Sequence, residues 1–187
     1  MTQRVALVVL LVVACGADAT TKPATAPATT QSAAAKVAEF QGEYRFLSNF
    51  WPAEVVYEGI TYPTAEHAYQ AAKTLDVDAR RTIAALATPG EAKSAGRKLK
   101  LRDDWETAKF VVMEDVVRLK FTTHADLRAK LLATGDGLLE EGNTWGDRVW
   151  GVYQGSGENR LGKILMKVRD ELRNASPPAD DPPDAGR

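Results

Sequence analysis

The stretch EVVYEGITYPTAEHAYQAAKTL, residues 54–75, decides the fold because it places a β-hairpin directly before a helix. β-branched and aromatic residues stand on both sides of the dipeptide Glu58-Gly59, which is typical of a tight turn between two short strands. Pro63 closes the hairpin, and the hydroxyl of Thr64 can cap a helix that occupies the rest of the stretch. This segment therefore predicts a short β element that leads straight into a helix.

The predicted helix carries a polar face. Glu66, Tyr69, Gln70 and Lys73 follow one another at the i, i+3, i+4 and i+7 spacing, which places their side chains on one side of a helix. Glu66 lies in the first turn, where the helix dipole favours the carboxylate anion and so suits a base or an electrostatic stabiliser. On the residues alone, a first-turn charge without a chemical role is the alternative interpretation.

The rest of the chain predicts a mostly helical domain. Hydrophobic periodicity and capping signals indicate further helices at residues 78–87, 88–99, 103–121, 123–133 and 159–173. The helix at residue 88 opens with TPGE, which combines a capping-box spacing with proline at the first helical position. A glycine-rich irregular stretch precedes the last helix, for which Asn159 can serve as the cap. We therefore expect an α+β fold, a predominantly helical single domain with a small β component, from residue 39 to 174.

The N-terminal residues 1–15 predict a signal peptide that ends like a bacterial lipobox. Arg4 precedes an uncharged apolar run that is too short to span a bilayer permanently. Cys15, the single cysteine of the chain, follows this run directly and is the predicted lipidation site and mature N-terminus. An ordinary signal cut near Ala17 or Ala19 is the alternative interpretation.

The composition of the two segments that flank the domain predicts that they are unstructured. Residues 16–38 are rich in Ala, Thr and Pro and predict a tether, and residues 175–187 predict a proline-rich acidic tail. With the lipobox, they indicate an exported lipoprotein of a bacterial envelope that touches the membrane only through its lipid anchor. If the signal interpretation is wrong, we expect a cytoplasmic protein.

Composition narrows the classes of partner. The chain has 187 residues, 44% of them hydrophobic, which is enough for one well-buried core. Its formal net charge is -1, so no readout of duplex nucleic acid is expected. His67 and His124 are the only histidines and there is one cysteine, so a zinc site is not predicted. His67 points away from the polar face of its helix and reads as structural, and His124 reads as a first-turn surface residue.

The stretch TWGDRVWG, residues 144–151, combines a carboxylate with aromatic rings. Cleavage of a bond between ribose and nitrogen passes through a cation-like sugar, so it needs a carboxylate and a donor for the departing base. Aromatic rings can hold that base by stacking. Trp150 is the better candidate for such a platform, Trp105 could be either core or platform, and Trp51 and Trp145 read as packing residues.

These segments resemble the YbiA-like or NADAR proteins, a family named after NAD and ADP-ribose. The resemblance covers nearly all of the predicted domain and rests on the motifs FLSNF at 46–50, YPTAEHAYQ at 62–70, GR at 96–97, WETAK at 105–109, WG at 150–151 and NRLG at 159–162. It implies a mostly helical α+β fold and N-glycosidase activity on riboflavin-pathway intermediates. Some members remove ADP-ribose from guanine bases. No metal or other cofactor is implied.

The resemblance also assigns roles to residues. It implies that Glu66 is the principal catalytic carboxylate and Asp147 a second one, and that Trp105 and Trp150 stack on the substrate. The further substrate contacts that it implies are Lys73, Arg97, Lys109, Asn159 and Asn49. Many family members have a glycine-rich polar run after the WG motif, where this chain has Val152-Tyr153, a departure that can alter substrate choice.

The predicted function is hydrolysis of N-glycosidic bonds by carboxylate-assisted attack of water on ribose C1. The expected partner is a phosphorylated nucleoside-like small molecule, either a riboflavin-pathway intermediate or ADP-ribosylated guanine. The family's substrates are cytoplasmic, so an exported member would need a different one. The alternatives are a lipoprotein module that binds ADP-ribose or NAD without cleaving it and an envelope lipoprotein that serves only protein contacts.

Overall fold

The computed structural model describes residues 36–175. The predicted signal peptide, Cys15 and most of the predicted tether and tail lie outside the described residues. The described residues include Val37, two positions before the predicted domain start at 39, which is buried and whose N–H donates to the carbonyl of Leu138 at 2.8 Å. Among residues 36–175, no helix is both long enough and apolar enough to cross a bilayer.

The hairpin forms as the sequence predicts. β1 (Val55–Tyr57) pairs antiparallel with β2 (Ile60–Tyr62). The turn residues Glu58 and Gly59 both have left-handed backbones, with φ of 47° and 77°. A two-residue turn of this kind matches the twist of the flanking strands, and glycine takes this conformation without steric cost.

Helix α1 (Ala65–Ala71) follows with Thr64 as its N-cap. The Thr64 hydroxyl accepts a hydrogen bond from the backbone N–H of His67 and lies 2.8 Å from the Nδ1 of the same residue. The other ring nitrogen of His67 lies 3.2 Å from the carbonyl of Leu86, and the imidazole is fully buried. The structural role predicted for His67 is therefore confirmed.

Replacing Thr64 by valine is expected to cost about 1–2 kcal/mol of unfolding free energy. The change keeps the shape of the side chain but removes the cap of α1 and the partner of the buried imidazole. Urea unfolding followed by circular dichroism measures the effect. Thr82→Val is the control, because the exposed Thr82 hydroxyl only bonds a carbonyl within its own helix and should change stability by less than about 0.5 kcal/mol. Equal midpoints for Thr64→Val and the parent would contradict the assigned cap.

The first three α-helices are all shorter than predicted. Helix α1 ends at Ala71 rather than near residue 75, because Asp76 caps the following helix α2 (Val77–Ala84) by accepting from the N–H groups of Asp78 and Ala79. Helix α3 (Pro89–Gly96) begins with the predicted capping box, in which both reciprocal hydrogen bonds are present. Both α2 and α3 pack against α1.

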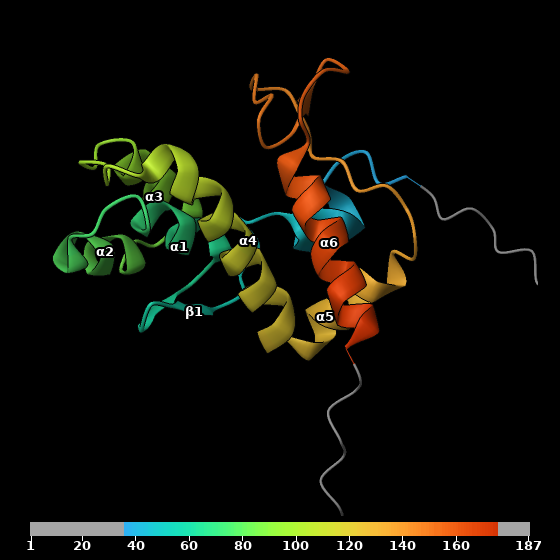
Figure 1. Ribbon diagram of the computed structural model, residues 1–187, viewed down its shortest axis with the longest axis horizontal. Coiled ribbons are helices and arrows are strands. Elements are labelled where there is room, and N and C mark those ends of the chain that lie inside the picture. The colour runs from blue at the N-terminus through green and yellow to red at the C-terminus, as the bar shows by residue number, and fades with distance from the viewer. Residues whose placement is uncertain (1–35, 176–187) are drawn as a thin grey trace, which may run out of the picture. The chain divides into compact units, whose positions relative to one another are not determined.

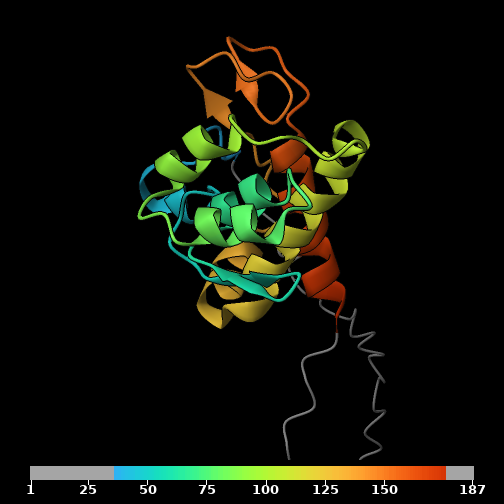
Figure 2. The same ribbon diagram turned by 90° about the vertical axis from the view of Figure 1, so that its left-hand side faces the viewer.

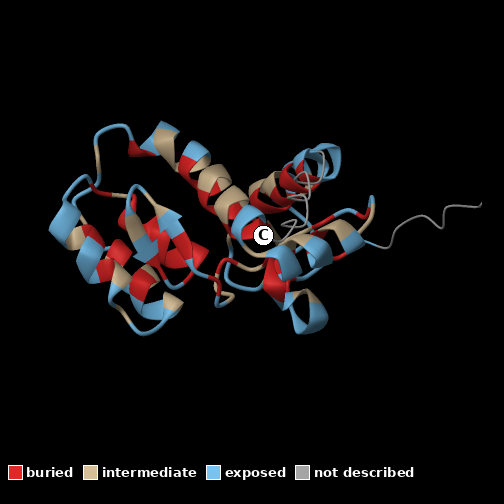
Figure 3. Cartoon of the chain, turned by 90° about the horizontal axis from the view of Figure 1, so that it is seen from below, coloured by how far each residue is buried: buried red, intermediate tan, exposed pale blue. Residues whose placement is uncertain are grey.

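The long helix α4 (Trp105–Thr123) lies between the α1–α3 group and the pair formed by α5 (Ala125–Ala133) and α6 (Arg160–Asn174), as Figure 1 shows. Buried residues gather on the sides of these helices that face one another (Figure 3). Helix α5 starts two residues later than predicted, because α4 continues through Thr123. His124 joins the two helices, and its Nε2 lies 2.7 Å from the carbonyl of Glu54.

A long loop precedes α6 and contains a second small sheet, in which β3 (Gly142–Asn143) pairs parallel with β4 (Val152–Tyr153). The loop extends beyond the N-terminal end of α6 (Figure 2). Asn159 precedes α6 as predicted, but its side chain does not cap the helix. Its left-handed backbone, with φ of 50°, turns the amide toward the loop, where it bonds the N–H of Glu141 and the carbonyl of Leu139. The fold is an α+β fold of mainly helical content.

Candidate active site

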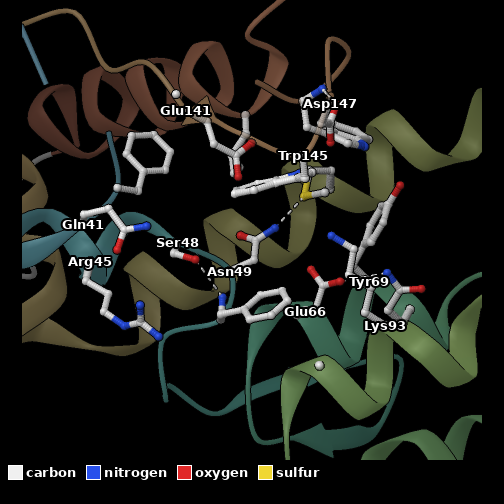
Figure 4. A pocket seen from close by; sticks show the side chains of 18 of the residues that line it. Gln41, Arg45, Ser48, Asn49, Glu66, Tyr69, Lys93, Glu141, Trp145 and Asp147 are labelled. Carbon is white, nitrogen blue, oxygen red and sulfur yellow. Dashed lines mark hydrogen bonds between the residues drawn. The ribbon is translucent and has the colours of Figure 1, made fainter. Parts of the chain in front are cut away.

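A cavity of about 700 Å³ lies where α1, α3, the segment 40–50 and the long loop meet. Figure 4 shows side chains from these parts of the chain pointing into it. Of the nine residues to which the resemblance gives a catalytic or substrate-binding role, six line this cavity: Asn49, Glu66, Lys73, Arg97, Asp147 and Trp150. Segments far apart along the chain therefore build one concave site of the size that small ligands occupy.

The polar face of α1 forms one wall. Glu66, Tyr69 and Gln70 line the cavity from α1 as their helical spacing predicts, and Lys73, two residues beyond the end of α1, lines it as well. The Gln70 Nε2 donates a hydrogen bond to the Glu66 carboxylate at 2.8 Å. Glu66 is only 6% exposed, so the cavity holds a carboxyl group that is almost fully removed from bulk water.

Burial has the largest influence on the pKa of Glu66. Burial raises the pKa of Glu66, whereas the hydrogen bond from Gln70 and the positive charges of Lys93 and Lys73 lower it. The position of Glu66 in the first turn of a helix indicates the effect of the dipole but does not reveal that the side chain is buried. The resulting carboxyl group is costly to ionise but has a donor and two cations that favour the anion, a combination common in groups that exchange protons during catalysis.

Gly96 lets α3 approach this hydrogen bond closely. A Cβ atom at this position would overlap the Oε1 atom of Gln70, so only glycine leaves room for the amide in its observed place. Gly96 therefore supports the orientation of Gln70, and through it the donor to Glu66.

We expect Gly96→Ala to lower kcat about tenfold, because displacing the Gln70 amide removes one hydrogen bond to a charged group, worth about 1.5 kcal/mol. Steady-state kinetics and circular dichroism together separate this effect from unfolding. Ser94→Ala, an exposed change on the same helix, should leave kcat unchanged. Full activity in a folded Gly96→Ala protein would show that the orientation of Gln70 does not matter.

The segment before the hairpin forms a second wall of the cavity, and hydrogen bonds from Lys120 fix its backbone. This segment contains the 3-10 helix η1 (Gly42–Leu47) and contributes Asn49 to the cavity. The Lys120 ammonium is fully buried and donates to the carbonyls of Phe46 and Ser48 at 2.6 and 2.8 Å. Burial lowers the pKa of Lys120 to about 7. Lys120 and Phe121 are among the residues that resemble the family, but the sequence assigned Lys120 no role, because nothing in its helical pattern shows which carbonyls it contacts.

The side-chain amide of Asn49 has a hydrogen-bond partner for its nitrogen but none for its oxygen among the described residues. Its Nδ2 donates to the sulfur of Met113 at 3.0 Å, and the backbone N–H of Glu66 donates to the backbone carbonyl of Asn49 at 3.1 Å. Within the described part of the chain, its buried Oδ1 has no hydrogen-bond donor. A ligand hydroxyl group can supply one, which agrees with the substrate contact that the resemblance implies for Asn49.

Asp147 and Trp150 enter from the long loop. The Oδ1 of Asp147 accepts hydrogen bonds from the N–H groups of Val149 and Trp150, both at 2.9 Å, so this carboxylate holds the turn that presents Trp150. The Trp150 ring meets Tyr69 edge to face with 5.7 Å between ring centroids. Asp147 lines the cavity as predicted, and one of its oxygens is committed to the loop.

Three predicted contacts lie outside the cavity lining. Trp105 is 5% exposed and packs behind Tyr69, with ring centroids 5.3 Å apart. Lys109 pairs with Glu106 at 2.5 Å on the exposed side of α4. Asn159 is buried beneath the loop and bonds its backbone. Trp105 and Asn159 therefore support the walls of the cavity, through Tyr69 and through the backbone of the long loop.

One aromatic assignment needs correction. Trp145 was expected to be a packing residue, but it is 60% exposed and lines the cavity. The Lys93 ammonium lies 5.8 Å from the centroid of its ring. The neighbouring Gly146 has φ of 88°, so the chain turns sharply here and leaves the indole outside the core.

Further charged residues line the cavity that the sequence did not single out. They are Arg45, Lys93 and Glu141. Lys93 and Arg97 are one turn apart on α3, so the helical spacing could have indicated Lys93. Glu141 and Arg45 stand in irregular or 3-10 segments that carry no such signal. No group of three or more His, Cys, Asp or Glu side chains among residues 36–175 is arranged to hold a metal ion.

Comparison with known proteins gives one family and relatives named N-glycosidases. A family model described as the NADAR domain matches residues 36–173. The chain is 44% identical over 135 residues to N-glycosidase YbiA of Escherichia coli, which covers 70% of this chain and 82% of that protein. It is 44% identical over 137 residues to N-glycosidase Npun_R5314 of Nostoc punctiforme, with coverage of 70% and 87%.

Two further similarities concern a longer protein and a solved structure. The chain is 38% identical over 135 residues to riboflavin biosynthesis protein VVA0006 of Vibrio vulnificus, which covers 71% of this chain but only 36% of that protein. The NMR structure of the E. coli protein YbiA superposes with a TM-score of 0.69 at 38% identity, over 76% of this chain and 87% of that one.

Proposed function

Because the chain belongs to the NADAR domain family, we propose that its cavity hydrolyses the N-glycosidic bond of a phosphorylated nucleoside-like molecule. The class of reaction follows from the family members at 44% identity, which are named N-glycosidases, so the chain is a hydrolase that acts on N-glycosyl compounds. The substrate class and the roles of the residues are the proposal.

The position of the buried Glu66 carboxyl group in the cavity wall is the observation that carries the proposal. This group accepts a hydrogen bond from Gln70 and has two lysines nearby. Its anion accepts a proton from a water molecule as the oxygen of that water bonds to ribose C1. The same negative charge stabilises the cation-like sugar while the bond to nitrogen breaks.

The charge of the cavity supports a phosphorylated substrate. Four cations line it: Arg45 in η1, Lys73 just after α1, Lys93 in α3 and Arg97 directly after α3. Lysine and arginine side chains that converge from separate elements are suited to bind phosphate oxygens. Binding energy at the phosphate would position the sugar with its C1 atom near Glu66.

The aromatic rings of Trp145 and Trp150 in the long loop are evidence for a substrate with a flat leaving group. Trp150 lines the inner part of the cavity, where Tyr69 and Phe110 hold its ring with centroids 5.7 Å away. Trp145 is exposed, and its indole is free to cover a bound base. A pyrimidine-like base of the riboflavin pathway and a guanine base that carries ADP-ribose both offer a face for stacking.

The proposal is tested by incubating the full chain with a panel of N-ribosyl phosphates. The panel contains phosphorylated riboflavin precursors, ADP-ribosylated guanine nucleotides and NAD, and mass spectrometry identifies the products. We expect at least one compound to yield a free base and the matching sugar phosphate. Tight binding by calorimetry without any product would instead favour a module that binds its ligand without cleaving it.

A further inference from the structure

Glu141 places a further carboxyl group in the cavity, and its backbone is held on both sides. Its N–H donates to the Oδ1 of Asn159 at 3.1 Å, and its carbonyl accepts from the N–H of Val152 at 2.8 Å. With the backbone held in this way, the side chain points into the cavity from the wall opposite Glu66 (Figure 4). The loop therefore presents Glu141 as a defined part of the site.

The carboxyl group of Glu141 lies in surroundings that favour its protonated form. No hydrogen bond or ion pair to it occurs within the described 36–175 region. Burial raises the pKa of Glu141 to about 7, the negative charges of Asp147 and Glu66 raise it as well, and Lys93 opposes them. The other cations of the cavity lining are Arg45, Lys73 and Arg97.

Glu66 and Glu141 differ in what surrounds them. Burial raises the pKa of both carboxyl groups, but at Glu66 the hydrogen bond from Gln70 and the positive charges of Lys93 and Lys73 oppose that rise. No donor is present at Glu141, where the nearby carboxylates favour the neutral acid. When two carboxyl groups share a site and their surroundings separate their proton affinities, one suits the role of base and the other the role of acid.

We propose that Glu141 is the general acid of the reaction and donates its proton to the nitrogen of the leaving base. This inference rests on the proposed function. As the bond between C1 and nitrogen breaks, its electron pair goes to the nitrogen, which receives the proton from Glu141. The oxygen of water bonds to C1 and its proton goes to Glu66. Glu66 then releases that proton to solvent and Glu141 takes one up, so that one water is consumed and no oxidant or reductant is needed.

The test compares two leaving groups in the parent and in Glu141→Gln. The first substrate is the riboflavin precursor or ADP-ribosylated guanine nucleotide that the parent cleaves fastest, and NAD is left out because its nicotinamide leaves as a neutral molecule without a proton. The second is p-nitrophenyl riboside 5-phosphate, whose phenolate leaves without a proton. We expect kcat to fall about 100-fold on the first substrate and less than about threefold on the second, because only the first needs general acid catalysis.

The pH profile gives an independent readout. An acid works in its protonated form, so the parent should lose activity on the N-ribosyl phosphate as the pH rises through about 7, the pKa of Glu141. Glu141→Gln should lack this basic limb, and Glu141→Asp, which keeps a carboxyl group, should retain it. Glu140→Gln is the matched control, since Glu140 pairs with Lys36 at 3.0 Å and does not line this cavity.

An equal loss on both substrates, or an unchanged basic limb in folded Glu141→Gln, would overturn the role of Glu141 and leave the proposed function intact. If the parent cleaves no compound of the panel, the proposed function fails and the role of Glu141 fails with it. Circular dichroism of each variant separates these outcomes from unfolding.

Discussion

Glu66→Gln is expected to lower kcat about 1,000-fold on any N-ribosyl phosphate that the parent cleaves. The substitution keeps the size of the side chain and an oxygen that can accept from Gln70, so the wall of the cavity should persist. What it removes is the group that takes the proton of water and stabilises the cation-like sugar. Removing a general base costs two to four orders of magnitude, roughly 3–5 kcal/mol of transition-state stabilisation.

Steady-state kinetics by product quantification measures this effect. Glu54→Gln is the control, because Glu54 is exposed and lies outside the cavity lining. The control should retain the parent's kcat within about twofold. A folded Glu66→Gln protein with less than a tenfold loss would remove Glu66 from the centre of the mechanism.

Phe121→Ala is expected to have the largest effect on stability, a loss of about 4 kcal/mol in the free energy of unfolding. Phe121 is fully buried in α4 and meets Phe46 edge to face with 6.4 Å between centroids. Its truncation leaves a cavity beneath η1, the segment that leads to Asn49 in the site. We therefore expect a large loss of stability together with a smaller loss of activity below the melting temperature.

Urea unfolding monitored by circular dichroism tests this expectation. Val111→Ala is the matched control on the same helix, because Val111 is 64% exposed and its truncation should cost less than about 0.5 kcal/mol. If the two variants lost similar stability, the packing of α4 against η1 would not hold the fold as described.

Local signals in the sequence were sufficient for much of the fold. The turn at Glu58-Gly59, the cap at Thr64 and the capping box at Thr88 depend on neighbouring residues, and all three form as predicted. Helix ends were less accurate where two helices compete for the same residues. The predicted end of α1 was wrong because Asp76 caps α2, an outcome that propensity alone does not decide.

Residue spacing predicted the candidate site only where a helix orders its residues, and the resemblance to the family supplied Asn49, Asp147 and Trp150. The spacing brought Glu66, Tyr69 and Gln70 of α1 together with Lys73, which follows that helix. It could not show that burial raises the pKa of Glu66, since burial depends on distant segments. The cavity positions of Glu141 and Trp145 and the support from Lys120 depend on contacts between residues far apart in the chain, so no local pattern reveals them.

The most direct test of the central claim measures binding and cleavage of one compound by the same variant. Calorimetry and product analysis are applied to Glu66→Gln with the N-ribosyl phosphate that the parent cleaves fastest. If Glu66 performs the chemistry in this cavity, the variant should bind the intact compound within about threefold of the parent's affinity and release almost no free base. Release of the base at the parent's rate would contradict the account.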